Sequence, residues 1–396
     1  MNKLTPAFLA AIMVLWAASI ASAQSKLPRT TPYLVASYGA KCDDATDDTR
    51  AIQTALNTAA ANCTYSTSFA TYTPVVSFPY GGVCKVNSGL TRSNCVNIDG
   101  NQTTLDFSKL SPTGTAITVV IPSTQSANSQ NGEGVIYIDN LHLNGSGANS
   151  IGIQLNAAGG VYRNVDIYNF GSGIRIGNNA FLHLFDNVSI TSYGVAGFSC
   201  PALLNNGGEN ERWTGGGIYN GFTGAAAIDN QGCEFNGVGL SIDFPSGPFV
   251  KNATGSAQST ASTKLTNFHM ERNSNPAVPA IDIGGGSGSA GACNTWSHVV
   301  LSNGAIINNS AGTVPNSLAI IRNNAVPCNG QSGQGGWAVI EDTHIAGWNP
   351  SGPCAVYDSR DMNATCVIGS NAGVVKLKDV ANGASAGLAF LNAGPN

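Results

Sequence analysis

Two glutamates and a histidine stand at positions from which acid–base chemistry is possible. Glu234, His269 and Glu271 fall at outward positions of short repeated segments. One carboxylic acid can protonate a leaving oxygen while a second carboxylate activates water, and a nearby imidazole can tune their protonation. If the segments are neighbouring strands, the Glu234 and Glu271 backbones lie about 8 Å apart, within the roughly 6.5–9.5 Å over which two carboxylates support inversion at a sugar carbon. We therefore predict Glu234, Glu271 and His269 as the catalytic group.

Charged and aromatic side chains near this group predict a surface that holds a polysaccharide. The glycines at 215–217 would leave the strand surface bare beside them. Charged groups can hydrogen-bond to sugar hydroxyls, and aromatic rings offer flat faces to sugar rings. The predicted substrate-binding residues are Glu209, Glu211, Arg212, Trp213, Tyr219 and Arg272.

Two alternatives remain open for these positions. Outward charged residues on repeated strands can simply be solvated, with His269 pairing with Glu234 across the strands. A second candidate group is Asp166, Tyr168 and Arg175, which stand on earlier segments of the same kind.

Short segments with one shared pattern recur along the chain and must position these residues. Aligned on Asn140, Asn164 and Asn187, the copies are 24 and 23 residues apart (164 − 140 and 187 − 164), a spacing typical of a solenoid. After each asparagine, apolar and variable residues alternate, as in a strand with one buried face. In this alignment segments 213–219, 230–236 and 265–271 are consecutive copies, which places Glu234 beside His269.

The alignment also separates inward from turn positions. The asparagines at the turns, with Asn267 and Asn303, are predicted to stack and to hydrogen-bond along the axis. The predicted inward residues are Leu141, Leu143, Val165, Ile167, Val188, Ile190, Phe235, Phe268, Met270, Ile306 and Ile345.

The segment 38–53, YGAKCDDATDDTRAIQ, resembles the FGAKGDGxTDDTxAIQ opening of the pectate-lyase-like superfamily. Its usual Phe-Pro-x-Gly strand continues at 78–81, and the resemblance covers about residues 34–105. It implies a right-handed parallel β-helix, the fold of polysaccharide lyases, polygalacturonases, epimerases and phage tailspikes. It also implies that a helix near 48–60 covers one end of the solenoid. Asp43, Asp44, Asp47 and Asp48 are then structural, with Asp47 and Asp48 placed to cap the helix amides.

These observations predict an all-β chain built as one solenoid. We expect a signal peptide over 1–23, a lead-in over 24–33, a right-handed parallel β-helix over 34–380 and a C-terminal tail over 381–396. The apolar run that ends at the small residues Ala21-Ser22-Ala23 is too short to span a bilayer, and no later segment is apolar enough for a membrane helix. The predicted location is secreted or periplasmic.

Composition and cysteine content agree with export. Only 10% of the residues are charged and there are 48 glycines, a composition typical of secreted β-structure. The net charge of −4 argues against a nucleic-acid-binding protein, which would carry basic stripes. An even count of ten cysteines behind a signal peptide favours disulfides. The absence of a Cys-x-x-Cys pair argues against a zinc site. Near neighbours, such as Cys84 with Cys95 and Cys354 with Cys366, are the predicted pairs.

Three functions are compatible with this sequence. The first is a secreted glycoside hydrolase that needs no cofactor. The second is a lyase or epimerase on a uronate polymer, in which His269 or Tyr219 abstracts a proton, Arg212 or Arg272 neutralises the carboxylate, and Ca²⁺ can take part. The third is a carbohydrate-binding protein without catalysis. The chain lacks the Asn-Thr-Asp, Asp-Asp and Arg-x-Lys set of polygalacturonases and the Arg-x-Pro-x-x-Arg of pectate lyases, so neither activity follows from the resemblance.

Overall fold

A computed structural model describes most of the chain between residues 31 and 382. The described ranges are 31–65, 70–121, 136–201, 207–222, 224–252, 261–273, 279–283, 297–309, 321–323, 337–346, 356–358, 375–378 and 381–382. The predicted signal peptide, nearly all of the predicted lead-in and the predicted tail beyond 382 lie outside these ranges. So do Cys293, Cys328, Cys354 and Cys366.

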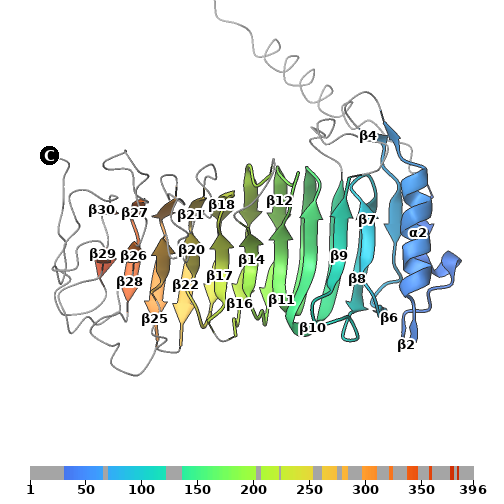
Figure 1. Cartoon of the computed structure of the whole chain (residues 1–396), viewed down its shortest axis with the longest axis horizontal. Helices are drawn as coiled ribbons and strands as arrows, with labels where there is room; N and C mark the ends of the chain where they lie inside the picture. Colours follow the sequence, from blue (N-terminus) through green and yellow to red (C-terminus); the bar gives the residue numbers. More distant parts are fainter. Residues whose placement is uncertain are drawn as a thin grey trace, which may run out of the picture. The chain divides into compact units, whose positions relative to one another are not determined.

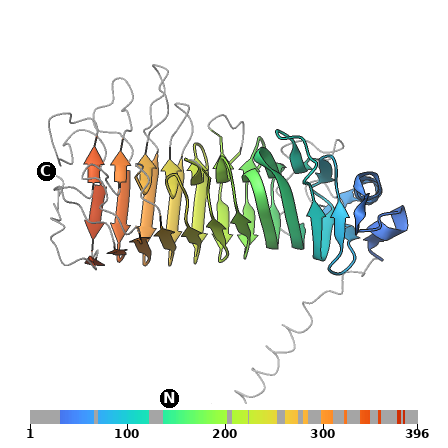
Figure 2. The same ribbon diagram turned by 90° about the horizontal axis from the view of Figure 1, so that it is seen from below.

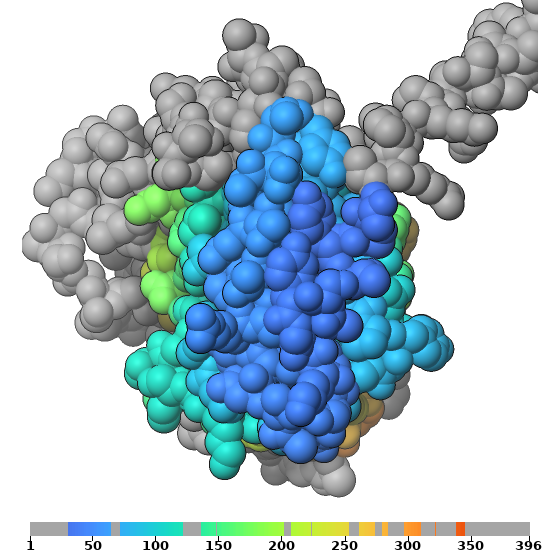
Figure 3. Space-filling view, turned by 90° about the vertical axis from the view of Figure 1, so that its right-hand side faces the viewer, coloured from blue at the N-terminus to red at the C-terminus, as the bar shows by residue number. Residues whose placement is uncertain are grey.

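One α-helix covers the N-terminal end of the stacked strands (Figures 1 and 3). Helix α2 (Thr49–Ala61) buries Ile52, Ala55, Leu56 and Ala59 on one face, as its 3.6-residue periodicity requires. It is the predicted capping helix, and it contacts β1, β5 and β7.

The aspartates before α2 are structural, as predicted, but only one of the two predicted capping carboxylates binds a helix amide. Oδ1 of Asp47 accepts hydrogen bonds from the amide and hydroxyl of Thr49 at the start of the helix. The Asp48 carboxylate instead accepts the amides of Lys41 and Cys42, so it fixes the preceding turn and caps no helix amide. The prediction that Asp48 caps the helix was therefore wrong.

The rest of the described chain is a right-handed parallel β-helix whose strands pair with strands one coil away (Figures 1 and 2). The first coils contain short elements: β1 (Tyr33–Leu34), η1 (Val35–Tyr38), β2 (Asp43–Asp47), β3 (Thr64–Tyr65), β4 (Ala70–Tyr72), β5 (Val75–Ser77), β6 (Val83–Lys85), β7 (Leu90–Ser93), β8 (Asn97–Asp106) and β9 (Thr115–Val120). The next two coils are the long, bent strands β10 (Tyr137–Asn156) and β11 (Gly160–Ile176). All pairings are parallel except the β3–β4 hairpin.

From residue 183 each coil contributes strands to three stacks. The first stack is β12 (His183–Asp186), β15 (Glu211–Thr214), β18 (Glu234–Val238), β21 (Ser262–Thr266), β24 (His298–Ser302), β27 (Trp337–Glu341) and β30 (Val375–Lys378). The second stack is β13 (Ser189–Thr191), β16 (Gly217–Tyr219), β19 (Ser241–Asp243), β22 (His269–Arg272), β25 (Ala305–Asn308), β28 (His344–Ala346) and β31 (Ala381–Asn382). The third stack is β14 (Ala196–Cys200), β17 (Ala226–Asn230), β20 (Val250–Asn252), β23 (Ile281–Ile283), β26 (Ile321–Asn323) and β29 (Val356–Asp358).

Coil length varies while the pairing register stays regular. In the second stack the paired residues are Ser189, Gly217, Ser241, His269, Ala305 and His344. Successive differences in residue number are therefore 28, 24, 28, 36 and 39. The extra residues lie between strands, so they do not disturb the stacking.

The interior is filled by the inward side chains of all three stacks. The predicted inward residues that have a described burial are all buried, whereas the side chain of Ile345 lies outside the described set. A column of aromatic rings runs through adjacent coils, with Phe185 against Trp213 and Phe198 against Phe235 at centroid distances of 5.2 and 4.8 Å. Such rings bury much apolar area and dominate the packing of this part of the core.

The turn between the first and second stacks holds the predicted asparagine ladder. Nδ2 of Asn164 donates to Oδ1 of Asn140 at 3.2 Å, and Nδ2 of Asn187 donates to Oδ1 of Asn164 at 2.9 Å. All three residues have φ between 51° and 53°, a left-handed conformation that asparagine tolerates better than most residues.

Three disulfides tie together the described part of the chain: Cys42–Cys84, Cys63–Cys95 and Cys200–Cys233. The predicted Cys84–Cys95 pair is wrong, because strand pairing places Cys84 in β6 beside Cys42, just before β2, and Cys95 pairs with Cys63, just after helix α2. Such bonds are typical of proteins that fold in an oxidising compartment. Within the described ranges, no helix is long and apolar enough to cross a membrane.

Candidate active site

Strand pairing brings a different carboxylate to His269 and Glu271 from the one predicted. Strand β22 pairs with β19, so that His269 is beside Ser241 and Glu271 is beside Asp243. Glu234 lies in β18 of the first stack, where its Cα partner is Ser262. The prediction that Glu234 and His269 are neighbours was therefore wrong, and the backbone separation derived from it does not apply.

Glu234 was predicted beside His269 because the sequence alignment required an asparagine at the turn between the first and second stacks. At position 239 this turn carries glycine instead. Gly239 stands two residues before Ser241, as Asn267 stands two residues before His269, and both have positive φ (68° and 53°). A glycine serves at this turn because it adopts left-handed φ without steric cost. An alignment that accepted glycine at the ladder position would have identified Asp243 from the sequence.

His269 lies within reach of both carboxylates of the new pair. Its Nε2 is 3.2 Å from Oε2 of Glu271 and 3.6 Å from Oδ1 of Asp243. The Ser241 hydroxyl donates to Oδ2 of Asp243 at 2.9 Å, and the Asn309 amide donates to Oε1 of Glu271. The carboxylate side chains are 18% (Asp243) and 25% (Glu271) exposed, whereas the imidazole is 41% exposed. We call Asp243, His269 and Glu271 the carboxylate cluster.

The environment of Asp243 favours its protonated form. Its Oδ1 is buried without a hydrogen-bond partner. Burial raises the pKa of the Asp243 carboxyl and the charge of Glu271 raises it further, whereas the Ser241 hydrogen bond and His269 act in the opposite direction. A carboxyl with a raised pKa beside a second carboxylate is the arrangement from which a general acid can be built.

Tyr219 lies next to Asp243 on the preceding strand of the second stack. A Cβ added at Gly217 would overlap the Tyr219 hydroxyl and ring, so the phenol lies over the bare backbone of Gly217. Burial raises the pKa of Tyr219, and the Asp243 charge adds to the rise. Tyr219 therefore stays a neutral hydroxyl at the edge of the carboxylate cluster, which favours substrate contact over proton abstraction.

The carboxylate cluster offers three possible metal ligands. One atom each of Asp243, His269 and Glu271 lie within 4.8 Å of one another. Calcium takes six to eight oxygen ligands, and two carboxylates with an imidazole are a poor match for it. The set is closer to the nitrogen and oxygen ligands of zinc.

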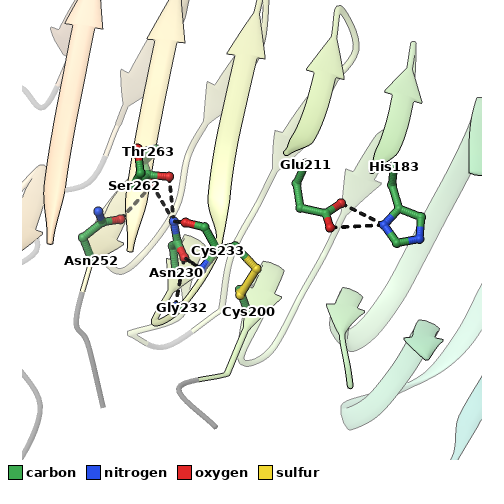
Figure 4. The surroundings of a disulfide bond; sticks show 9 residues. All are labelled: His183, Cys200, Glu211, Asn230, Gly232, Cys233, Asn252, Ser262 and Thr263. Carbon is green, nitrogen blue, oxygen red and sulfur yellow. Dashed lines mark hydrogen bonds and ion pairs between the residues drawn. A yellow bond between two sulfur atoms is a disulfide. The ribbon is translucent and has the colours of Figure 1, made fainter. Parts of the chain in front are cut away.

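Two residues predicted to bind substrate belong to the core. Figure 4 shows Glu211 facing His183, whose Nδ1 lies 2.9 and 3.2 Å from the two carboxylate oxygens. Both side chains are fully buried, and Nε2 of His183 lies 2.9 Å from the carbonyl of Ala157. Trp213 is also fully buried and donates through Nε1 to the carbonyl of Gly215. The predictions for Glu211 and Trp213 were wrong because β15 turns these two residues inward and Arg212 outward.

The other predicted contacts are dispersed. Arg272 is buried over the ring of Phe249 and donates to the carbonyl of Gly247, so it does not face the solvent beside Glu271. Arg212 is exposed in the first stack and Glu209 is exposed just before it, both on the side of Glu234. Of the predicted substrate-binding residues, only Tyr219 lies beside the carboxylate cluster.

The alternative group also separates. Asp166 and Tyr168 lie in the part of β11 that pairs with the second stack, and the Asp166 carboxylate is 2.8 Å from Nδ1 of His142. Arg175 pairs with Ser199 in the third stack, on another side of the coil. Asp166 and Tyr168 therefore share a face with the carboxylate cluster, and Arg175 does not.

Solved structures with a similar fold include a phage tailspike domain and a polysaccharide hydrolase. The enzymatically active domain of tailspike protein 4 of bacteriophage CBA120 aligns with a TM-score of 0.53 at 15% identity, over 88% of this chain and 44% of that chain. ORF18 of Geobacillus virus E2 has a TM-score of 0.49 at 12% identity, over 96% of this chain and 64% of that chain. This chain therefore spans less than two thirds of either protein.

An endo-xylogalacturonan hydrolase from Aspergillus tubingensis aligns with a TM-score of 0.49 at 14% identity, over 87% of this chain and 92% of that chain. No protein-family model and no curated protein sequence matches this chain. At these identities the comparisons establish the fold, whereas the chemistry has to come from the residues themselves.

Proposed function

We propose that this chain, which has the fold of the pectate-lyase-like right-handed parallel β-helix proteins, hydrolyses a glycosidic bond in a polysaccharide. Asp243 is the general acid and Glu271 is the nucleophile. The observation that supports the proposal is the register that places these two carboxylates side by side, with His269 within reach of both. Burial raises the pKa of Asp243, which is the direction that a general acid needs.

The short separation of the carboxylates favours a double displacement. At least one oxygen of Asp243 lies within 4.8 Å of an oxygen of Glu271, an approach compatible with the roughly 5–5.5 Å between carboxyl groups of retaining enzymes and closer than the roughly 6.5–9.5 Å of inverting ones. Asp243 donates its proton to the glycosidic oxygen while Glu271 forms a bond to the sugar carbon and the leaving group departs. Asp243 then takes a proton from water, and the resulting hydroxide displaces Glu271 and releases the sugar.

The Asn309 hydrogen bond and His269 support the role of Glu271. The amide of Asn309 holds one oxygen of Glu271, and the imidazole faces the other. Tyr219 is placed to contact the sugar, since its ring lies next to Asp243 over Gly217. We place this activity outside the cytoplasm, because three disulfides lie in the described chain.

The test compares carboxylates inside and outside the cluster. Asp243→Asn and Glu271→Gln should each lower turnover of a cleaved polysaccharide by roughly 10²- to 10⁴-fold with folding intact. Glu234→Gln is the matched control, because it removes an exposed carboxylate of the first stack, and it should leave turnover near that of the wild type. The readouts are new reducing ends and absorbance at 235 nm, which detects the unsaturated uronate that a lyase produces.

Each other outcome points to a different function. Loss of activity in Glu234→Gln alone would move the site to the first stack. Product absorbance at 235 nm would indicate a lyase, and binding without cleavage would indicate a carbohydrate-binding protein.

A further inference from the structure

The outward residues of the second stack form two continuous columns that lead from the N-terminal coils to the carboxylate cluster. The strand register aligns positions 144, 168, 191, 219, 243 and 271 in one column and 142, 166, 189, 217, 241 and 269 in the other. We call these twelve positions the ladder face. Neighbouring strands lie about 4.8 Å apart, so a chain molecule on this face would meet a new pair of side chains at each step of that length.

The ladder face carries negative charge and no lysine or arginine. Asp166, Asp243 and Glu271 contribute three carboxylates to the twelve positions, and His142 and His269 are the two titratable bases. Three described cations lie near its ends and edges, and each has a partner: Lys85, two strands before Asn144 in the same column, pairs with Asp44 and Asp106, Arg163 pairs with Asp139, and Arg272 is buried over Phe249. Proteins recognise carboxylate groups mainly through arginine and lysine. A polymer with a carboxylate on each sugar would instead face negative side chains along the ladder face.

Two aromatic residues mark the same face. Tyr168 is 52% exposed, although most aromatic side chains of the described coils are buried in the core. It lies two strand steps, about 9.6 Å, from Tyr219 in the same column. Between and beside them stand the small or uncharged residues Thr191, Ser189 and Gly217. The surface between the two tyrosine rings is therefore formed by small side chains, two of which carry hydroxyl groups. Uncharged sugars can stack on the rings and accept hydrogen bonds from these hydroxyls.

We propose that the substrate is an uncharged glycan that lies along the ladder face, with Tyr168 as a stacking platform two strands before Tyr219. This inference rests on the proposed function and names its substrate class. Polymers of uronic acids are disfavoured, because the ladder face offers carboxylates where such polymers need cations. The Asp166–His142 pair lies beside the Tyr168 end and offers hydrogen-bonding groups to sugar hydroxyls.

The first test measures binding by the Glu271→Gln protein, in which the lowered turnover predicted above should keep the substrate intact during the measurement. The probes are the uncharged glycans arabinoxylan, galactomannan and mixed-linkage β-glucan, and the polyuronates polygalacturonate and alginate, in affinity electrophoresis at low salt. At least one uncharged glycan should bind, and both polyuronates should run without retardation. Stronger retardation by a polyuronate than by every uncharged glycan, or no retardation by any probe, would overturn the substrate class.

The second test isolates the platform. Tyr168→Ala should weaken binding of the long uncharged glycan by roughly tenfold, the effect of losing about 1.4 kcal/mol of contact. Tyr80→Ala is the matched control, because Tyr80 is a tyrosine that is 80% exposed, lies in the turn between β5 and β6 and is not one of the twelve positions of the ladder face. Equal affinities of the Tyr168→Ala and Tyr80→Ala proteins would overturn the platform. That failure is distinct from failure of the proposed function, which would appear as unchanged cleavage by Asp243→Asn and Glu271→Gln.

Discussion

Replacing Glu211 by leucine should damage stability rather than substrate binding. The Glu211 and His183 side chains are both fully buried, and they contact each other at 2.9 Å. Nε2 of His183 faces the carbonyl of Ala157, which can only accept, so this nitrogen donates and Nδ1 depends on Glu211 for its partner. Breaking a buried pair by removing one member costs roughly 3–5 kcal/mol, because the remaining group is left buried without compensation.

The measurement is a double-mutant cycle in urea. Glu211→Leu and His183→Leu should each lower the free energy of unfolding, and the double variant should lose about 1–3 kcal/mol less than the sum of the single losses. Arg212→Leu is the matched control, since Arg212 is the exposed neighbour on the same strand and should change stability little. A Glu211→Leu protein with wild-type stability and a raised KM would refute the reasoning, because it would place Glu211 in contact with substrate.

Three further predictions concern the carboxylate cluster and Tyr219. The Ser241 hydrogen bond lowers the pKa of Asp243, so Ser241→Ala should raise that pKa; because the general acid must be protonated, the alkaline limb of kcat/KM should move to higher pH, and a move to lower pH would contradict the assignment. The adjacent carboxylates should give a product with retained anomeric configuration in proton NMR of the first turnovers, whereas an inverted product would require a second, more distant carboxylate. Gly217→Ala should displace the Tyr219 ring and raise KM several-fold for a long glycan at unchanged thermal stability, and an unaltered KM would show that the ring position does not affect binding.

Repetition explains why the fold was predictable from the sequence. Each coil presents the same alternation of inward and outward residues, so the buried Leu141, Val165 and Val188 could be assigned from one aligned set. The asparagine turns and the amphipathic helix α2 were predictable for similar reasons, because each is a local pattern with a local physical cause.

The site was less predictable, because the pairing register of its strands depends on which residues of successive coils are aligned with each other. Glycine replaced asparagine at 239, and this moved Asp243 out of the predicted column and Glu234 into it. Because side chains alternate along a strand, the position of one copy fixes all of its neighbours, so the single misplaced segment 230–236 put the wrong carboxylate beside His269 and Glu271. Burial of charged side chains was a second source of error. Glu211 is in the core only because His183 of the preceding coil pairs with it, and nothing local to residue 211 records that contact.

The disulfides show the same limit. Cys200 and Cys233 are 33 residues apart but occupy adjacent coils, so their pairing follows from stacking rather than from distance along the chain. Economy of loop length favoured Cys84 with Cys95, whereas the fold pairs each with a cysteine more than thirty residues away, at separations of 42 and 32.

The uneven coil lengths have a consequence for how such a chain can evolve. Between Ser189 and His344 the number of residues per coil ranges from 24 to 39. The strands of the second stack nevertheless keep one pairing register. Each coil contacts mainly its two neighbours, so an insertion between strands is confined to its own rung. Selection can therefore lengthen, shorten or exchange the segments between strands while Asp243 and Glu271 keep their pairing. New glycan preferences become accessible by changing loops, at little risk to the chemistry.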